Sequence, residues 1–468
     1  MYFSDRGVRP VGRAGAFVAG ADDLGAVWYN PAGIAFAGES VLADASWLRF
    51  RSTYQRRSVV RDPATGEEVT QGTNYFPEVE GTSPVLPIPT LAASNRLGMD
   101  EKWMFAASVL APYSALTSYP ETDIAFRGRT VPPPQRYSLV TLDGSALAVI
   151  GLHAAYKPSP SFALGASFQM LTGTFASRLA FNACPPKNLL CAEEDPAYDA
   201  YTQLTVGPIF APSANAGFIA VVSDAPGAEV RLGGSFQLPF WVNSPAKSEI
   251  RLPSAAVFRD ASVEGDRARV AFKLPAIARL GIETRLGQKK QTRMELAVFY
   301  EAWSMHDRIT ITPAGDGIKL RNVTGFPDPY VVGELAQARG FRDTFSIHGG
   351  VEHEFDAGGY PMAVRSGVSY ERSAVPPEYL SVLTVDLDKV QVALGSSLYV
   401  AQKRNLRLDA VIAYTFGFTT DVDPKAAQIT KVKVVRANDP AAEDQTKING
   451  GRYSGGAMVL GVGLNWKY

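Results

Sequence analysis

The charged side chains that could do chemistry here recur at every second position of alternating segments. Arg279, Glu283 and Arg285 share one face of a segment, and Arg293 and Glu295 share the matching face of the next. Successive side chains of a β-strand point to opposite faces, so residues two apart face the same way. Further charges on the same kind of face are Glu301, Arg365, Glu371, Arg407 and Asp409.

Because the opposite faces are apolar, we expect these charges to line an interior. Charges of mixed sign on neighbouring walls pair with each other and with an enclosed segment. Two alternatives stay open. The charges could line a solvated pore, and one arginine could bind a carboxylate, although no spacing singles one out.

The histidines indicate no catalytic site. His348 and His353 differ by five positions, so they point to opposite faces of a flat strand. His348 shares its face with Glu352 and Glu354, but no nucleophilic serine stands at a recognisable spacing. We expect no enzymatic activity and no cofactor.

Cys184 and Cys191 lie in one expected loop without a nearby histidine. A zinc site wants four ligands, so we expect a disulfide in an oxidising compartment and no metal.

Composition favours a membrane barrel. Hydrophobic residues make up 46% of 468 residues, yet the mean hydropathy is −0.04. No apolar run approaches the roughly 18 residues of a membrane helix. Lys+Arg and Asp+Glu are 46 each, whereas nucleic-acid-binding proteins are basic, so no nucleic-acid partner is expected.

Apolar and polar residues alternate through to the last residue, as in Leu460, Val462, Leu464 and Trp466. Short links, such as 157–160 and 287–290, alternate with long ones, such as 58–83 and 313–340. This asymmetry is typical of outer-membrane barrels. Fourteen antiparallel strands are expected, at 40–57, 84–97, 102–119, 136–157, 161–181, 203–222, 228–252, 266–286, 291–312, 341–356, 361–372, 385–401, 405–420 and 451–468.

So wide a barrel needs a plug, because its wall side chains cannot fill it. Residues 1–39 suit this role: they are rich in glycine, and Asp22, Asp23 and Asn30 can bond wall arginines or cap short helices. We therefore predict an all-β protein with an N-terminal hatch (1–39) inside a transmembrane barrel (40–468).

Several motifs carry a family resemblance. The run Tyr29-Asn30-Pro31-Ala32-Gly33-Ile34-Ala35 resembles the hatch signature of the FadL/TodX outer-membrane transport family. Later motifs occur in the family's order: Leu274-Pro275 with Arg279-Leu280-Gly281, Asp343-Thr344-Phe345-Ser346, Pro377-Glu378-Tyr379-Leu380-Ser381 and the closing Gly461-Val462-Gly463-Leu464-Asn465-Trp466. Together they span nearly the whole chain.

The resemblance implies passive import of hydrophobic molecules, such as long-chain fatty acids or aromatic hydrocarbons, across a Gram-negative outer membrane. Hatch movement then opens a lateral route through a kinked third strand. The matching residues are Tyr2 and Phe3 at the hatch tip, Asn30, Pro31, Ala32 and Gly33 in the hatch, and Ala111, Pro112, Tyr113 and Ser114 at the kink. Partners implied are hydrophobic small molecules, lipids or detergent, and we expect a monomer.

Pro112 supports a kink independently, because it cannot donate a ladder hydrogen bond. The alternative is that Pro112 marks the outer end of the third strand. A second function also stays open: a FadL-like barrel acting as a surface adhesin, or as a platform for a secretion or lipoprotein partner. No secretory signal precedes Tyr2, so we expect the numbering to begin at the mature end or after a removed export signal.

Overall fold

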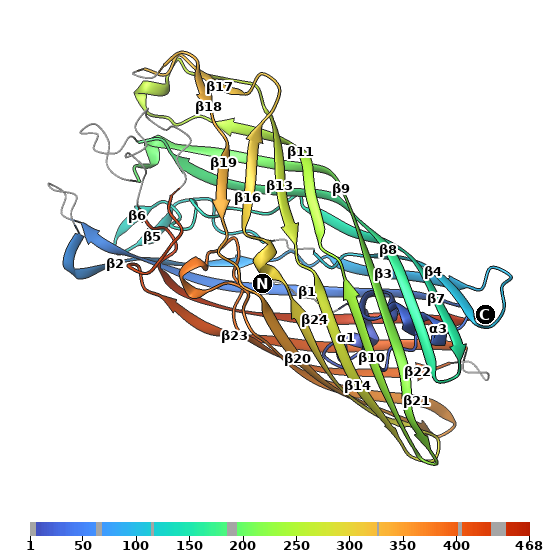
Figure 1. Cartoon of the computed structure of the whole chain (residues 1–468). Coiled ribbons are helices and arrows are strands. Elements are labelled where there is room, and N and C mark those ends of the chain that lie inside the picture. The colour runs from blue at the N-terminus through green and yellow to red at the C-terminus, as the bar shows by residue number, and fades with distance from the viewer. Residues whose placement is uncertain are drawn as a thin grey trace.

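A computed structural model shows a closed, 14-stranded antiparallel barrel (Figure 1). It describes residues 6–61, 68–113, 117–184, 194–324, 327–400, 405–431 and 446–468. The predicted fold class is confirmed. The first strand pairs with the last along its length, from Ser40 opposite Lys467 to Arg56 opposite Gly451, and this pairing closes the wall.

Nine wall positions are single strands: β1 Ser40–Arg61, β4 Trp103–Leu110, β7 Ala146–Ser159, β8 Phe162–Asn182, β9 Asp199–Ala225, β21 Tyr360–Glu371, β22 Lys389–Tyr399, β23 Leu406–Val422 and β24 Gly451–Lys467. The other five are each made of two strands: β2 Glu68–Thr82 with β3 Pro87–Asn95, β10 Ala228–Gln237 with β11 Phe240–Arg251, β13 Arg267–Leu274 with β14 Ile277–Leu286, β15 Thr292–Glu301 with β16 Arg308–Pro313, and β19 Leu335–Ala338 with β20 Thr344–Ala357.

Short elements lie in the connections. They are β5 Ile124–Phe126, β6 Arg129–Val131, β12 Ser262–Glu264, β17 Ile318–Arg321, β18 Tyr330–Val332, and the 3₁₀ turns η2 Pro196–Tyr198, η3 Ala256–Phe258, η4 Trp303–Met305 and η5 Pro377–Tyr379. No helix in the described part of the chain is both long and apolar enough to cross a membrane.

Two loops and two strand boundaries predicted from the sequence are wrong. The expected loop 58–83 is largely strand, because β1 and β2 extend the wall with polar residues on both faces and lack apolar alternation. The expected loop 313–340 contains β17, β18 and β19: β17 and β18 form a separate three-stranded sheet with β12, and β19 pairs with β16 of the wall. These strands have only three or four residues each, too few for a clear periodic signal. The expected strand 136–157 begins only at Ala146, and the expected strand 102–119 ends at Leu110.

Residues 6–38, here called the hatch segment, lie inside the barrel toward the end that holds the C-terminus (Figure 1). The segment contains α1 Val8–Val11, α2 Ala26–Tyr29, η1 Pro31–Gly33 and α3 Ile34–Ala37. Trp28, Tyr29 and Phe17 are at most 1% exposed and join the main apolar core with inward side chains of the wall. The wall's lipid-facing side is apolar, for example Leu280, Trp241 and Phe210.

Candidate functional site

The Asn30 turn attaches the hatch segment to the wall. Its side-chain amide donates to the carbonyls of Val18 and Phe218, both at 2.9 Å, and its oxygen accepts from the Ala32 N–H at 3.2 Å. Glycines make room for it: a Cβ on Gly217 would lie 2.3 Å from the Asn30 oxygen, and one on Gly165 2.3 Å from the Pro31 carbonyl carbon.

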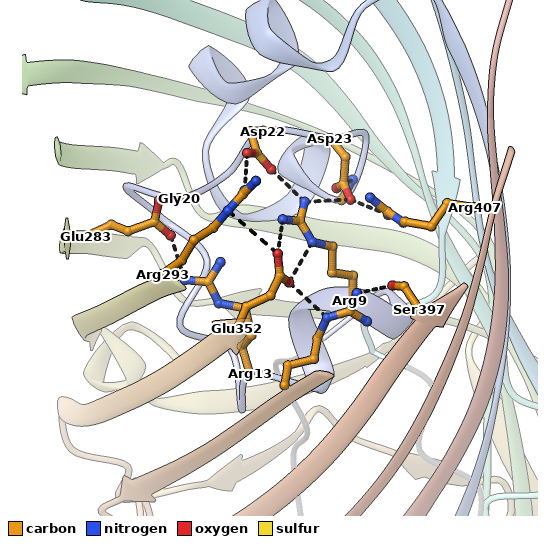
Figure 2. A network of polar contacts seen from close by, with 12 residues as sticks. Arg9, Arg13, Gly20, Asp22, Asp23, Glu283, Arg293, Glu352, Ser397 and Arg407 are labelled. Carbon is orange, nitrogen blue, oxygen red and sulfur yellow. Dashed lines mark hydrogen bonds and ion pairs between the residues drawn. The ribbon is translucent and has the colours of Figure 1, made fainter. Parts of the chain in front are cut away.

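A buried network of ion pairs joins the hatch segment to one side of the wall (Figure 2). Arg9 donates to Asp22 (2.6 Å) and Asp23 (3.0 Å) within the segment and to Glu352 of β20 (2.7 Å). Wall arginines complete the network: Arg293 bonds Asp22 at 2.5 Å, and Arg407 bonds Asp23 at 2.6 Å.

A second buried cluster surrounds Arg13, which is fully buried. Its guanidinium donates to Glu283 of β14 (2.7 Å) and Glu295 of β15 (3.0 Å). Glu295 also accepts the backbone N–H groups of Val18, Ala19 and Gly20 at 2.6–3.0 Å. The cluster therefore attaches the hatch segment to the wall both at Arg13 and at residues 18–20.

The ten charged wall residues singled out from the sequence face inward, and those that form ion pairs have side chains at most 14% exposed. Glu283, Arg285, Arg293, Glu295 and Arg365 belong to the two networks. Arg279 lies apart, with its guanidinium 5.3 Å from the centroid of the Trp28 ring. The solvated-pore alternative does not fit this burial.

The sequence did not single out Arg9 and Arg13, the hatch residues that pair with these wall carboxylates, or Arg6, which donates to wall carbonyls. A usable signal was present. Three arginines lie three and four positions apart in a segment otherwise rich in glycine and alanine. Because buried charges need partners, arginines in an enclosed segment are expected to pair with inward-facing glutamates of the wall.

The wall is interrupted on the opposite side of the barrel. β4 ends at Leu110, and Ser118 rejoins the wall through isolated bridges to Thr82 and Thr141. Ala111, Pro112 and Tyr113 are thus out of the ladder at the place where a kink is expected. The predicted strand 102–119 ends at Leu110, but the chain returns to the same wall position at Ser118, so Pro112 marks both a strand end and an interruption of the wall.

The predicted kink residues contact the hatch segment directly. The Arg6 guanidinium donates to the carbonyls of Ala111 (3.2 Å) and Pro112, while the Arg6 backbone N–H donates to the Tyr29 hydroxyl (2.8 Å). The Tyr113 ring packs edge-on against Trp28, with centroids 6.2 Å apart. Tyr2, Phe3 and Ser114 lie outside the described residues.

A cavity of ≈ 380 Å³ opens beside this interruption. Around it the wall ladder is broken at three neighbouring positions: between β2 and β3, after β4, and before β7. Residues at each of these breaks line the cavity. Its apolar lining includes Leu48, Phe50, Pro84, Leu86, Pro87, Ile88, Ala111, Leu142, Leu147, Val382 and Val385. Leu48 and Ile88 also line a ≈ 40 Å³ chamber whose lining includes the charged side chains of Arg6, Glu371 and Lys389.

Cys184 is disulfide-bonded, and Cys191 lies outside the described residues. The described residues contain no group of side chains that could hold a metal ion.

Comparisons with known proteins agree on one family. The family model of outer membrane protein transport proteins (OMPP1/FadL/TodX) matches residues 2–468. No protein of curated function matches the sequence. Similar solved structures include a Pseudomonas aeruginosa FadL homologue (13% identity, TM-score 0.64, 100% of both chains) and the Ralstonia pickettii toluene transporter TbuX (14%, 0.57, 99% of both). The P. putida toluene transporter TodX is similar too (13%, 0.58, 98% of both).

Proposed function

The chain belongs to the OMPP1/FadL/TodX family of outer-membrane transporters of hydrophobic compounds, and we propose that it releases its cargo sideways through the interrupted wall. The ≈ 380 Å³ apolar cavity receives the cargo. The hatch segment regulates the exit between the cavity and the membrane. The comparisons give no support to the adhesin or platform alternative.

The contact of Arg6 with Ala111 and Pro112 carries this proposal. It joins the start of the hatch segment to the two residues at which β4 leaves the wall. The carbonyls of a broken strand lose their ladder partners and need other donors, because a membrane offers none. Arg6 supplies donors while its backbone is tied to Tyr29, so a shift of the hatch tip changes the hydrogen bonding of the break.

Apolar side chains at the break favour a membrane exit. Val85 is 64% exposed and Leu86 52% exposed, and they lie in the gap between β2 and β3. A molecule in the cavity meets apolar surface along this path. The similar structures include toluene transporters and a FadL homologue. We propose fatty acids or aromatic hydrocarbons as cargo.

The experiment measures uptake of labelled fatty acid and of toluene in a host without its own transporter. Arg6→Gln, Pro112→Ala and deletion of residues 2–8 should each lower uptake. For Arg6→Gln we expect uptake to fall about tenfold, since hydrogen bonds to charged groups contribute about 1.5–3 kcal/mol. Arg51→Gln, which removes an exposed pair with Glu80, is the matched control and should leave uptake unchanged. Wild-type uptake of both compounds in all three variants would refute the gating role.

We also propose that the barrel is a monomer, because the closed wall leaves no strand edge to pair with another copy. Its mass in detergent, measured by light scattering with a correction for bound detergent, tests this. A dimer mass at low protein concentration would contradict it.

A further inference from the structure

A strip of basic side chains lies on the outer face of the wall at β11 and β13. The strip consists of Lys247, Arg251, Arg267, Arg269 and Lys273, and all of them are exposed. These two strands are neighbours on the upper part of the barrel in Figure 1. The residues alternate with buried ones, as Val270 does between Arg269 and Ala271, so they face away from the lumen.

The strand register places the basic residues of the strip near one another. Lys273 lies opposite Trp241, Arg269 opposite Pro245, and Arg267 opposite Lys247, with the uncharged pair Ala271 and Asn243 between the first two. Side chains of directly opposed residues are neighbours, and successive outward residues follow along each strand. Three of the four outward positions from Lys273 to Arg267 therefore carry positive charge.

The strip begins where the apolar outer band ends. Trp241 is 65% exposed, and the Lys273 ammonium lies 5.9 Å from its ring centroid. Below Trp241, toward the chain ends, the outward side chains are apolar, such as Phe236 and Leu280. Tryptophan marks the membrane–water boundary, and lysine extends from the apolar band to the water. The strip thus lies at the headgroup level of the outer leaflet.

The charge of the strip is only partly neutralised. Lys247 pairs with Glu249 at 2.8 Å and with Asp266 at 3.7 Å. Arg267, Arg269 and Lys273 form no ion pair with any other residue in the described part of the chain. Asp307 lies within electrostatic reach of Lys273, and Glu334 accepts a hydrogen bond from Thr312, which lies opposite Arg269. Neither carboxylate is within ion-pair distance of the strip.

Other parts of the wall have acidic residues at the matching place. On β20, the outward Phe345 ends the apolar band, and Asp343 follows it. On β23, Phe418 is followed by Asp421, whose side chain is 55% exposed. The basic strip is therefore a local feature and not a belt around the barrel.

We propose that this strip binds the phosphorylated headgroup of an outer-leaflet lipid. The acyl chains of such a lipid lie along Trp241 and Phe236, which brings its phosphates level with Lys273, Arg269 and Arg267. Guanidinium groups match phosphate oxygens bidentately, and a basic residue near an anionic lipid surface contributes about a fivefold gain in affinity. β8 and β9 separate the strip from the interrupted wall, so lipid binding leaves the cargo exit clear.

Native mass spectrometry of the detergent-solubilised barrel tests the proposal. The probes are bis-phosphorylated lipid A and the same lipid with its phosphates removed. The wild type should bind the phosphorylated form at least about tenfold more tightly, and the preference should shrink as salt is added, since exposed charges are screened. The Arg267→Gln/Arg269→Gln/Lys273→Gln variant should bind both forms alike.

The matched control is Lys102→Gln/Lys289→Gln, which removes exposed charges at the other end of the barrel and should keep the preference. Heat-shifted gel migration checks that each variant is a folded barrel. A triple variant with wild-type preference, or a wild type without any preference, overturns the proposal. Neither outcome bears on cargo transport.

Discussion

Arg13 shows at the residue scale how charge positions the hatch segment. Its guanidinium and both of its carboxylate partners are fully buried. Breaking such a pair by removing one partner costs about 3–5 kcal/mol, because a buried charge is left unpaired. The pair therefore specifies where the segment lies and adds little to net stability over an apolar alternative.

We predict that Arg13→Ala loosens the hatch segment and makes the barrel leak ions. Glu283 and Glu295 would then repel each other without a cation between them, and water would enter. Single-channel conductance in planar bilayers should rise severalfold over the nearly closed wild type. Arg51→Ala, at an exposed ion pair, should leave the conductance unchanged. A closed Arg13→Ala barrel would show that the ion pairs do not keep the segment in place.

At the element scale, the extracellular end of β1 carries its own ion pair. Arg56 donates to both carboxylate oxygens of Glu194, at 2.9 and 2.5 Å. Burial alone would raise the pKa of Glu194, but the Arg56 guanidinium holds that pKa below its ordinary value. A lowered folded pKa means that the stabilisation is present above the unfolded pKa and is lost as the pH falls through the folded one.

We predict that Glu194→Gln speeds hydrogen exchange of residues 194–199 severalfold at pH 7, because the charged bond to Arg56 is gone. The wild type should keep its protection at pH 5 and 6. Its exchange rate, corrected for the intrinsic rate at each pH, should approach that of the variant only below the ordinary glutamate pKa of about 4.3. Equal exchange in both proteins at pH 7 would contradict a stabilising pair.

For the whole molecule, the two sides of the hatch segment are attached differently. Its ion pairs go to β14, β15, β20 and β23. Among the described residues no ion pair joins it to β4, β7, β8 or β9, where Tyr113 and the glycines pack against it. Releasing the whole segment would break several buried pairs, at a cost on the order of 10 kcal/mol. We therefore expect the ion-paired part of the hatch segment to stay in place during transport and any movement to occur on its side at the interrupted wall.

We predict that a disulfide between Gly12→Cys and Gly395→Cys leaves uptake unchanged. A Cβ on either glycine would lie 3.3 Å from the Cα of the other, so the two positions are in direct contact across the hatch and β22. The experiment uses a Cys184→Ala/Cys191→Ala background and compares oxidised with reduced cells. Loss of uptake on oxidation, restored by reduction, would show instead that the body of the segment must leave.

The sequence by itself determined the barrel, its family and which faces look inward. The period of two places Glu283 and Arg285 on one face whatever the neighbouring strands are, so this information is local. It left open whether Ala111, Pro112 and Tyr113 leave the wall, because Pro112 fits both an interruption and a strand end. Only the tertiary structure decided which charges pair and that Arg6 meets Ala111 and Pro112. Those contacts join residues more than 100 positions apart, and only closure of the barrel around the hatch segment brings them within hydrogen-bonding distance.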